Sequence, residues 1–301
     1  MKIKKAFAIL LLLLSATLSG AAQPKQATLR AWDDYILDLK MSMATRASGD
    51  TPFLELYDSP EVMQRVQRGE VVVSDHDPRK VPQGLIHHWI GAMFVPNLTI
   101  DQVIKVLCDY GHYSDFYSPL IKKSVVLERD GDKAMVTIVA VQKAFSVTAA
   151  VDTDNEVQVM RLAGNRLYIM TDAVRVQEVA DYGQPNQHLF SEDRRPGYVW
   201  RSFVLQRIEA RDGGVYIELE TVALSRGIPL EVRWLIKPLT DQLPRRLMLD
   251  TLNETRVAVG QENPSSQSQG LSNLKPKWIR MTAVSAGIVG LPATADFWNS
   301  K

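Results

Sequence analysis

The sequence of 301 residues contains a single cysteine, Cys108. One cysteine cannot form an internal disulfide, so the fold must be held together by its hydrophobic core. Cys108 stands among Val103, Ile104 and Leu107. This setting predicts a buried, unreactive thiol rather than a nucleophile.

The short signatures of several enzyme and metal-binding classes are also absent. The chain has no Gly-x-Ser-x-Gly, Gly-x-Gly-x-x-Gly, Walker, His-Glu-x-x-His or Cys-x-x-Cys sequence. Their absence argues against an esterase-type nucleophile, a dinucleotide or P-loop site, and the common zinc sites. His87 and His88 are adjacent, so in one strand they would point to opposite faces and could not share a metal ion. We therefore predict no catalytic residue set, no metal site and no cofactor.

Charge of one sign is not in excess. The formal net charge is +1, and loss of the first 22 residues would leave 32 basic against 34 acidic residues. A nucleic-acid partner would require a concentrated basic face, so we exclude nucleic acid as a partner. The neighbouring carboxylates of Glu218 and Glu220 are better explained by one solvated strand face than by a glycosidase pair.

Long apolar runs are few, and the first is at the N-terminus. Three lysines precede the run Ala6 to Leu14, and small residues follow at Ser19 to Ala22. This is the pattern of a signal peptide, cleaved near Ala21-Ala22, and it predicts an exported protein, periplasmic or secreted. A retained anchor is the alternative. No cysteine follows the run, which excludes a lipidated N-terminus.

The C-terminal residues 261–301 form a polar, low-complexity linker and a tail. The apolar run Ala283 to Ala293 is interrupted by two glycines and a proline. It is too short for a span of about 20 residues, so we predict a poorly ordered tail and no stable membrane span after signal cleavage.

Between these ends, we predict that residues 23–83 form a helical N-terminal extension. We expect this extension to pack on the outside of a main domain, residues 84–260. Ala27 to Met43 carries apolar residues on one helical face, and Pro60 to Arg68 has proline near its start and glycine just after its end. Ser74 to Gly84 contains two prolines and reads as a loop.

The main domain is rich in strand patterns. Leu85 to Pro96 is the first, and Thr99 to Gln102 is a capping box that opens a short helix. Further strands are expected at Lys122 to Arg129, Lys133 to Gln142, Ala144 to Val151, Val157 to Leu162, Arg166 to Ala180, Tyr198 to Ala210 and Val215 to Arg226. Asp152 to Asn155 reads as a turn, and Gly183 to Gly197 as a polar loop.

The last two strands flank Asp212-Gly213, a strong hairpin signal. A two-residue turn there places Arg207 opposite Glu218. The register puts Trp200, Ser202, Val204 and Ile208 on an inward face. The face with Arg207, Glu218 and Glu220 is expected to be solvated, with partial cover from the N-terminal helix.

The segment Ile228 to Val259 is the only long helical candidate that follows the strands. Leu243, Leu247, Leu252 and Val259 recur at roughly helical spacing. Asp241 is a plausible N-cap, and Pro238 predicts a bent or broken lead-in.

The order of the predicted elements is similar to that of the helix-grip fold: one strand, a capped helix with an aromatic turn, a meander and a long C-terminal helix. The sequence resembles the START-like (SRPBCC) superfamily in IGAMFVPNLTIDQVIKVLCDYGHYSDFYSP, in the hairpin VWRSFVLQRIEARDGGVYIELETVALSRGIP and in the helix after it. Asp109-Tyr110 and Phe116-Tyr117 match its Asp-aromatic passage. That superfamily includes lipid-transfer, coenzyme Q-binding and polyketide cyclase-like proteins, and secreted bacterial members without a settled function. The resemblance implies an α+β fold, a curved antiparallel sheet wrapped around the C-terminal helix, with a hydrophobic-ligand cavity between them.

Side chains from separate elements would surround such a cavity. The candidates are Trp89, Phe116, Tyr117, Tyr168, Asp172, Trp200, Trp234 and Leu239. The alternative is that the aromatic residues fill the core. Asp172 interrupts an apolar strand. It is expected either to form a structural ion pair with Arg175 or Arg201, or to act as a polar anchor for a ligand.

Three functions are consistent with this reading. The first is an exported, non-enzymatic carrier for a lipid-like or aromatic small molecule. The second is a cyclase-like enzyme in which a buried group such as His88 or Asp172 moves protons in the same cavity. The third is a structural protein that binds an envelope protein partner. The lack of a catalytic signature favours the carrier.

Overall fold

The structure is a computed structural model that describes residues 24–144, 147–190, 199–227 and 230–261. The predicted signal peptide and the predicted C-terminal tail lie outside these residues, as do residues 191–197 of the predicted polar loop. None of the described helices is long and apolar enough to cross a membrane.

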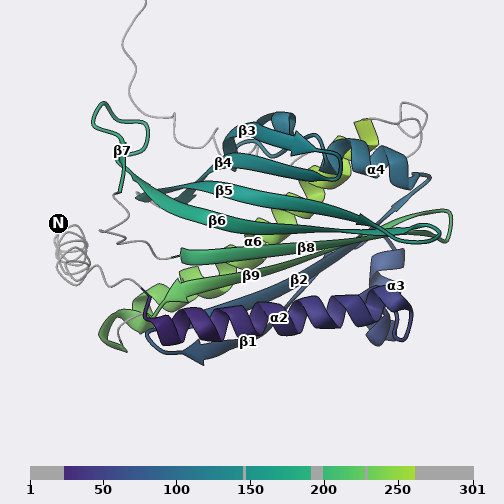
Figure 1. The fold of residues 1–301 in the computed structure, drawn as a ribbon, viewed down its shortest axis with the longest axis horizontal. Helices are drawn as coiled ribbons and strands as arrows, with labels where there is room; N and C mark the ends of the chain where they lie inside the picture. The colour runs from purple at the N-terminus through teal and green to yellow at the C-terminus, as the bar shows by residue number, and fades with distance from the viewer. Residues whose placement is uncertain (1–23, 145–146, 191–198, 228–229, 262–301) are drawn as a thin grey trace, which may run out of the picture. The chain divides into compact units, whose positions relative to one another are not determined.

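One antiparallel sheet forms the centre of the fold, and its strands run in the order β1-β2-β9-β8-β6-β5-β4-β3, with β7 paired to β6 (Figure 1). The strands are β1 (Val72–Val81), β2 (Gly84–Pro96), β3 (Ile121–Asp130), β4 (Lys133–Ala144), β5 (Val147–Arg161), β6 (Arg166–Ala180), β7 (His188–Leu189), β8 (Val199–Arg211) and β9 (Gly214–Arg226). The α+β prediction is confirmed.

Helix α6 (Leu230–Gln261) and helix α4 (Ile100–Leu107) cover one face of this sheet, the inner face. The predicted capping box starts α4, since Thr99 accepts from the backbone N–H of Gln102 and the Gln102 side chain accepts from that of Thr99. A Cβ atom on Gly91 of β2 would lie 2.7 Å from Leu252 and from Met248 of α6. Glycine at this position therefore lets the helix approach the strand closely.

Helix α2 (Gln26–Ser48), the short helix η1 (Glu55–Asp58) and helix α3 (Pro60–Gln67) cover the opposite, outer face. Trp32, Ile36 and Met43 of α2 are buried in one apolar cluster with Phe203, Leu205 and Val222 of the sheet. Strand alternation separates this cluster from the one under α6. The N-terminal helix is the predicted cover of this face, and the structure places it there.

The segment predicted as a loop, Ser74 to Gly84, instead forms most of β1 and a two-residue turn at Pro82-Gln83. Pro78 lies where the pairing with β2 is irregular, between His76 and Arg79. An edge strand with a bulge tolerates proline because no ladder hydrogen bond is needed there. The loop prediction is wrong for this reason, and the sheet begins before Gly84.

Two further predictions are corrected. Asp152 to Asn155 is not a turn but the middle of β5, where the charges of Asp152 and Asp154 are taken up by Arg175 of β6. Helix α6 is continuous from Leu230, so Asp241 is no N-cap and Pro238 does not break the helix.

The passage between α4 and β3 contains two short helices, η2 (Tyr110–His112) and α5 (Tyr113–Phe116). Tyr110 is buried, and Tyr113 donates to the backbone carbonyl of Leu107 at 2.6 Å. Cys108, at the end of α4, is buried as predicted, and burial raises the pKa of its thiol. A buried thiol with a raised pKa is a poor nucleophile.

Candidate functional site

Burial on the inner face of the sheet changes along the strands. At one end, Leu167, Ile208, Ile217 and Met93 face each other across four strands, and each is 0–1% exposed. Four residues farther along β6, the corresponding residues Thr171, Val204 and Thr221 are only half-buried, whereas Trp89 of β2, opposite Thr221, is buried. The inner face is therefore closed at one end and, apart from Trp89, less tightly covered toward the other.

A cleft of about 310 Å³ lies between α6 and the strands β3 and β4. The cleft does not overlap the fully buried row but lies farther along β4 and β5. The lining residues are Pro119, Leu120, Lys122, Val141, Gln142, Arg246, Leu247, Asp250 and Glu254. This volume is at the lower end of the range for small-molecule sites, and the lining combines apolar and polar groups as such sites do.

Glu254 contributes a buried polar atom to this cleft. Its Oε2 atom has no hydrogen-bond partner among the described residues. Burial, helped by the negative charge of Asp250, raises the pKa of the Glu254 carboxyl to about 7. A carboxyl group in such a setting carries a proton part of the time at neutral pH.

Three of the eight residues predicted from the sequence lie on the inner face. Trp89 belongs to the apolar cluster beneath α6, and Phe116 packs against that cluster. Tyr117 is 4% exposed, and its hydroxyl lies 3.1 Å from the Thr255 hydroxyl of α6. This contact fastens the turn before β3 to α6, beside Glu254. A role in ligand binding for these three residues stays a prediction.

Tyr168 and Asp172 do not join them, because both lie on the outer face. Tyr168 packs in the cluster under α2, opposite Arg207. Asp172 is half-exposed and lies 3.9 Å from Lys40 of α2 rather than beside Arg175 or Arg201. Burial raises the pKa of Asp172, and Lys40 opposes that rise. The structure thus gives Asp172 an ion pair, and its predicted place in the inner cavity is wrong.

Trp200 was also assigned to the inner face and lies instead in the outer cluster. The pairing of β8 with β9 shifts between Val199 and Arg201, so Trp200 occupies an irregular position where the alternation of faces is reset. Ser202 and Val204, after the irregularity, keep their predicted face. The side chains of Trp234 and Leu239 lie outside the described residues.

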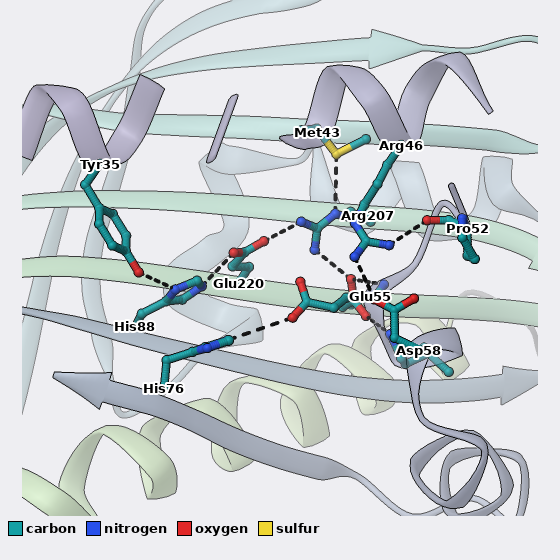
Figure 2. A network of polar contacts seen from close by, with 12 residues as sticks. Tyr35, Met43, Arg46, Pro52, Glu55, Asp58, His76, His88, Arg207 and Glu220 are labelled. Carbon is teal, nitrogen blue, oxygen red and sulfur yellow. Dashed lines mark hydrogen bonds and ion pairs between the residues drawn. The ribbon is translucent and has the colours of Figure 1, made fainter. Parts of the chain in front are cut away.

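The outer face holds a buried polar network under α2 (Figure 2). Arg207 of β8 donates to Glu218 Oε1 at 2.6 Å and to Glu220 Oε2 at 2.5 Å. Glu220 Oε1 lies 2.6 Å from His88 Nε2, and His88 Nδ1 lies 2.7 Å from the Tyr35 hydroxyl. The face expected to be solvated is therefore among the most buried parts of the protein, since Arg207 and Glu218 are both 0% exposed.

Two segments of the N-terminal extension complete this network. The backbone N–H groups of Glu55 and Leu56 donate to the Glu218 carboxylate at 3.1 and 2.9 Å, and Met43 Sδ lies 3.3 Å from Arg207 Nε. Burial raises the pKa of Glu218, and the charge of Arg207 opposes that rise. For Glu220 burial acts in the same direction, but His88 and Arg207 hold its pKa below the ordinary value.

This network has the character of a structural anchor rather than a reaction centre. Both ring nitrogens of His88 and both guanidinium ends of Arg207 already have internal partners. Burial raises the pKa of Tyr35, so its hydroxyl keeps its proton and is a poor nucleophile. Within the described residues, no three His, Cys, Asp or Glu side chains gather closely enough to hold a metal ion.

Comparison with known proteins yields no matching family model, and no curated protein sequence matches. Solved structures do match. A STAR-related lipid transfer protein from Xanthomonas axonopodis is 15% identical, with 64% of this chain and 99% of that chain covered and a TM-score of 0.43.

The Zhui aromatase/cyclase from Streptomyces sp. R1128 is 13% identical over 58% of this chain and 94% of that one, with a TM-score of 0.40. Human StAR-related lipid transfer protein 5 is 11% identical over 73% and 98%, also with a TM-score of 0.40. In the antiparallel sheet, the first long strand, β2, pairs with the last strand, β9, and the sheet packs against the helix that follows β9. This is the predicted helix-grip arrangement. With identities of 11–15% and TM-scores of 0.40–0.43, no superfamily, ligand or reaction is carried over from these proteins to this chain.

Sequence reasoning did not single out Glu254 as a site residue. The signal was present, because Leu247, Asp250 and Glu254 are spaced three and four residues apart and therefore share one flank of a helix. What the sequence does not show is that β3 and β4 face this flank and take the carboxyl group out of water.

Proposed function

We propose that this START-like chain is a non-enzymatic binding or carrier protein for a hydrophobic small molecule, and that it acts after export from the cytoplasm. The observation that carries the proposal is the cleft between α6 and the strands β3 and β4, with Pro119, Leu120 and Leu247 among its apolar lining residues. Export is supported by the N-terminal sequence pattern, in which lysines, an apolar run and small residues follow one another.

The arrangement of the histidines favours binding over catalysis. His88, the base suggested for a cyclase-like reaction, lies on the face of the sheet away from the cleft and is held by Tyr35 and Glu220. No histidine is among the residues that line the cleft. An envelope protein partner finds no support in the described part of the chain.

A neutral fluorescent dye such as Nile red tests the proposal when it is titrated into delipidated protein. Leu247→Arg places a charge in the cleft and should weaken dye binding at least tenfold. Val257→Arg is the matched control, because Val257 is 56% exposed on the same helix and outside the cleft lining. It should change the affinity less than twofold. Equal binding by both variants, or no binding by the unmodified protein, would reject the site.

A further inference from the structure

The Glu254 side chain lines the cleft, and its Oε2 atom has no hydrogen-bond partner within the described part of the chain. This atom is buried, and nearly all buried polar atoms in native proteins are paired. Leaving such an acceptor unpaired is unfavourable, because the group loses its hydrogen bond to water without gaining another. A cost of this kind at the wall of a cleft indicates that a bound molecule provides the missing donor.

The surrounding charges define what kind of donor fits. Within the cleft, Asp250 and Arg246 lie 3.7 Å apart and take up each other's charge. Lys122 is exposed and makes no bond to Glu254 Oε2, and the Tyr117 hydroxyl is engaged by Thr255. Among the described residues, Glu254 is thus an acidic group without an ion-pair partner, next to a second carboxylate, Asp250.

We propose that the cleft binds a primary amine with an apolar body, whose ammonium group donates hydrogen bonds to the Glu254 carboxylate. This inference rests on the function proposed above and names the headgroup of the ligand. An ammonium group supplies both the missing donor and the missing positive charge, whereas a hydroxyl group supplies the donor alone. The apolar body lies against Pro119, Leu120 and Leu247.

Binding of an amine should change the protonation of the Glu254 carboxyl group. Because burial raises the pKa of Glu254 to about 7, this group carries a proton part of the time at neutral pH. An ammonium ligand favours the ionised carboxylate, so binding displaces that proton to the solvent. A neutral alcohol of the same shape makes no such demand.

Three soluble probes with one apolar scaffold test the proposal by calorimetry: 4-phenylbutylamine, 4-phenylbutanol and 4-phenylbutyrate. The unmodified protein should bind the amine at least tenfold more tightly than the alcohol at pH 7. Titrations in buffers of different ionisation enthalpy should show that the amine releases more protons than the alcohol.

Glu254→Gln keeps the shape of the side chain and should reduce amine affinity to that of the alcohol, with the alcohol affinity nearly unchanged. Val257→Gln is the control on the same helix, because Val257 is 56% exposed and does not line the cleft. It should keep the preference for the amine. Thermal unfolding of both variants verifies that each is folded.

The possible outcomes distinguish a failure of the ammonium proposal from a failure of the cleft as a binding site. Equal affinity for amine and alcohol, or an amine preference that survives Glu254→Gln, would overturn the ammonium proposal and leave the apolar site standing. Tightest binding of the carboxylate would also overturn it, in favour of recognition by Lys122 or Arg246. Failure of all three probes to bind, together with failure of the dye, would reject the cleft itself.

Discussion

Arg207 in β8 and Glu218 in β9 face each other across the hairpin, and both side chains are completely buried. The guanidinium group joins Glu218 to Glu220, and through Glu220 to His88 and Tyr35. Since Tyr35, Met43 and residues 55–56 belong to the N-terminal segments, the network ties these segments to the sheet. The outer face of the sheet is therefore fastened by charge as well as by apolar packing.

Removal of Arg207 should be strongly destabilising. Arg207→Met leaves two buried carboxylates without their cation, and breaking a buried ion pair in this way costs about 3–5 kcal/mol. Urea unfolding followed by circular dichroism measures the change. Arg161→Met is the control, because Arg161 is about half-exposed and 3.5 Å from Asp132, and it should cost less than about 0.5 kcal/mol. A loss of similar size in both variants would contradict the anchoring role.

The close approach of α6 to β2 depends on Gly91. Gly91→Val should lower the free energy of unfolding by about 1–3 kcal/mol, because its side chain would collide with Leu252 and Met248. Gly111→Ala is the control, since a Cβ atom there meets nothing within 4 Å. Chemical denaturation compares the two, and an unchanged stability of Gly91→Val would show that α6 does not pack closely here.

The raised pKa of Glu254 predicts how stability depends on pH. The folded protein binds this proton more tightly than the unfolded chain, so the contribution of Glu254 is most favourable below the ordinary pKa of 4.5 and is lost as pH rises through about 7. Glu254→Gln should therefore gain stability relative to the parent between pH 5 and pH 8. Because the side chain is partly exposed, we expect a gain of about 1 kcal/mol.

Urea midpoints of parent and variant across this pH range provide the measurement. A difference that stays constant with pH would mean that Glu254 has an ordinary pKa. Asp250→Asn supplies a second test, because removal of the neighbouring negative charge should move the effect of Glu254 to lower pH.

Asp172 should be dispensable for ligand binding. Its side chain pairs with Lys40 on the outer face, away from the cleft beside α6. Asp172→Asn should change dye or amine affinity less than twofold, as measured by the titrations described for Leu247. A tenfold loss would place the binding site on the α2 side of the sheet.

Local sequence signals predicted the hairpins well. Asp212-Gly213 gave the register of β8 and β9, including the pairing of Arg207 with Glu218, because the turn residues adopt positive φ angles of 57° and 76°. Alternation then assigned most side chains to the correct face. It failed at Trp200, where an irregular pair resets the alternation, and such irregularities leave little trace in sequence.

The environment of the predicted elements was harder to predict. The sequence predicts a solvated face at Arg207, Glu218 and Glu220, because three charges on one face of a hairpin are usually exposed to solvent. Their burial depends on how completely α2 and η1 cover the hairpin, which is a tertiary property. Asp152 and Asp154 were read as turn residues for a similar reason, since their cation, Arg175, lies on the neighbouring strand.

The central claim, that the chain carries a hydrophobic small molecule, is tested most directly by native mass spectrometry of the protein as purified from its own host. The spectrum should show a discrete excess mass that is lost after extraction with organic solvent, and the extracted compound should be an apolar amine. A mass equal to that of the polypeptide alone, in samples never exposed to denaturant or solvent, would contradict the carrier function.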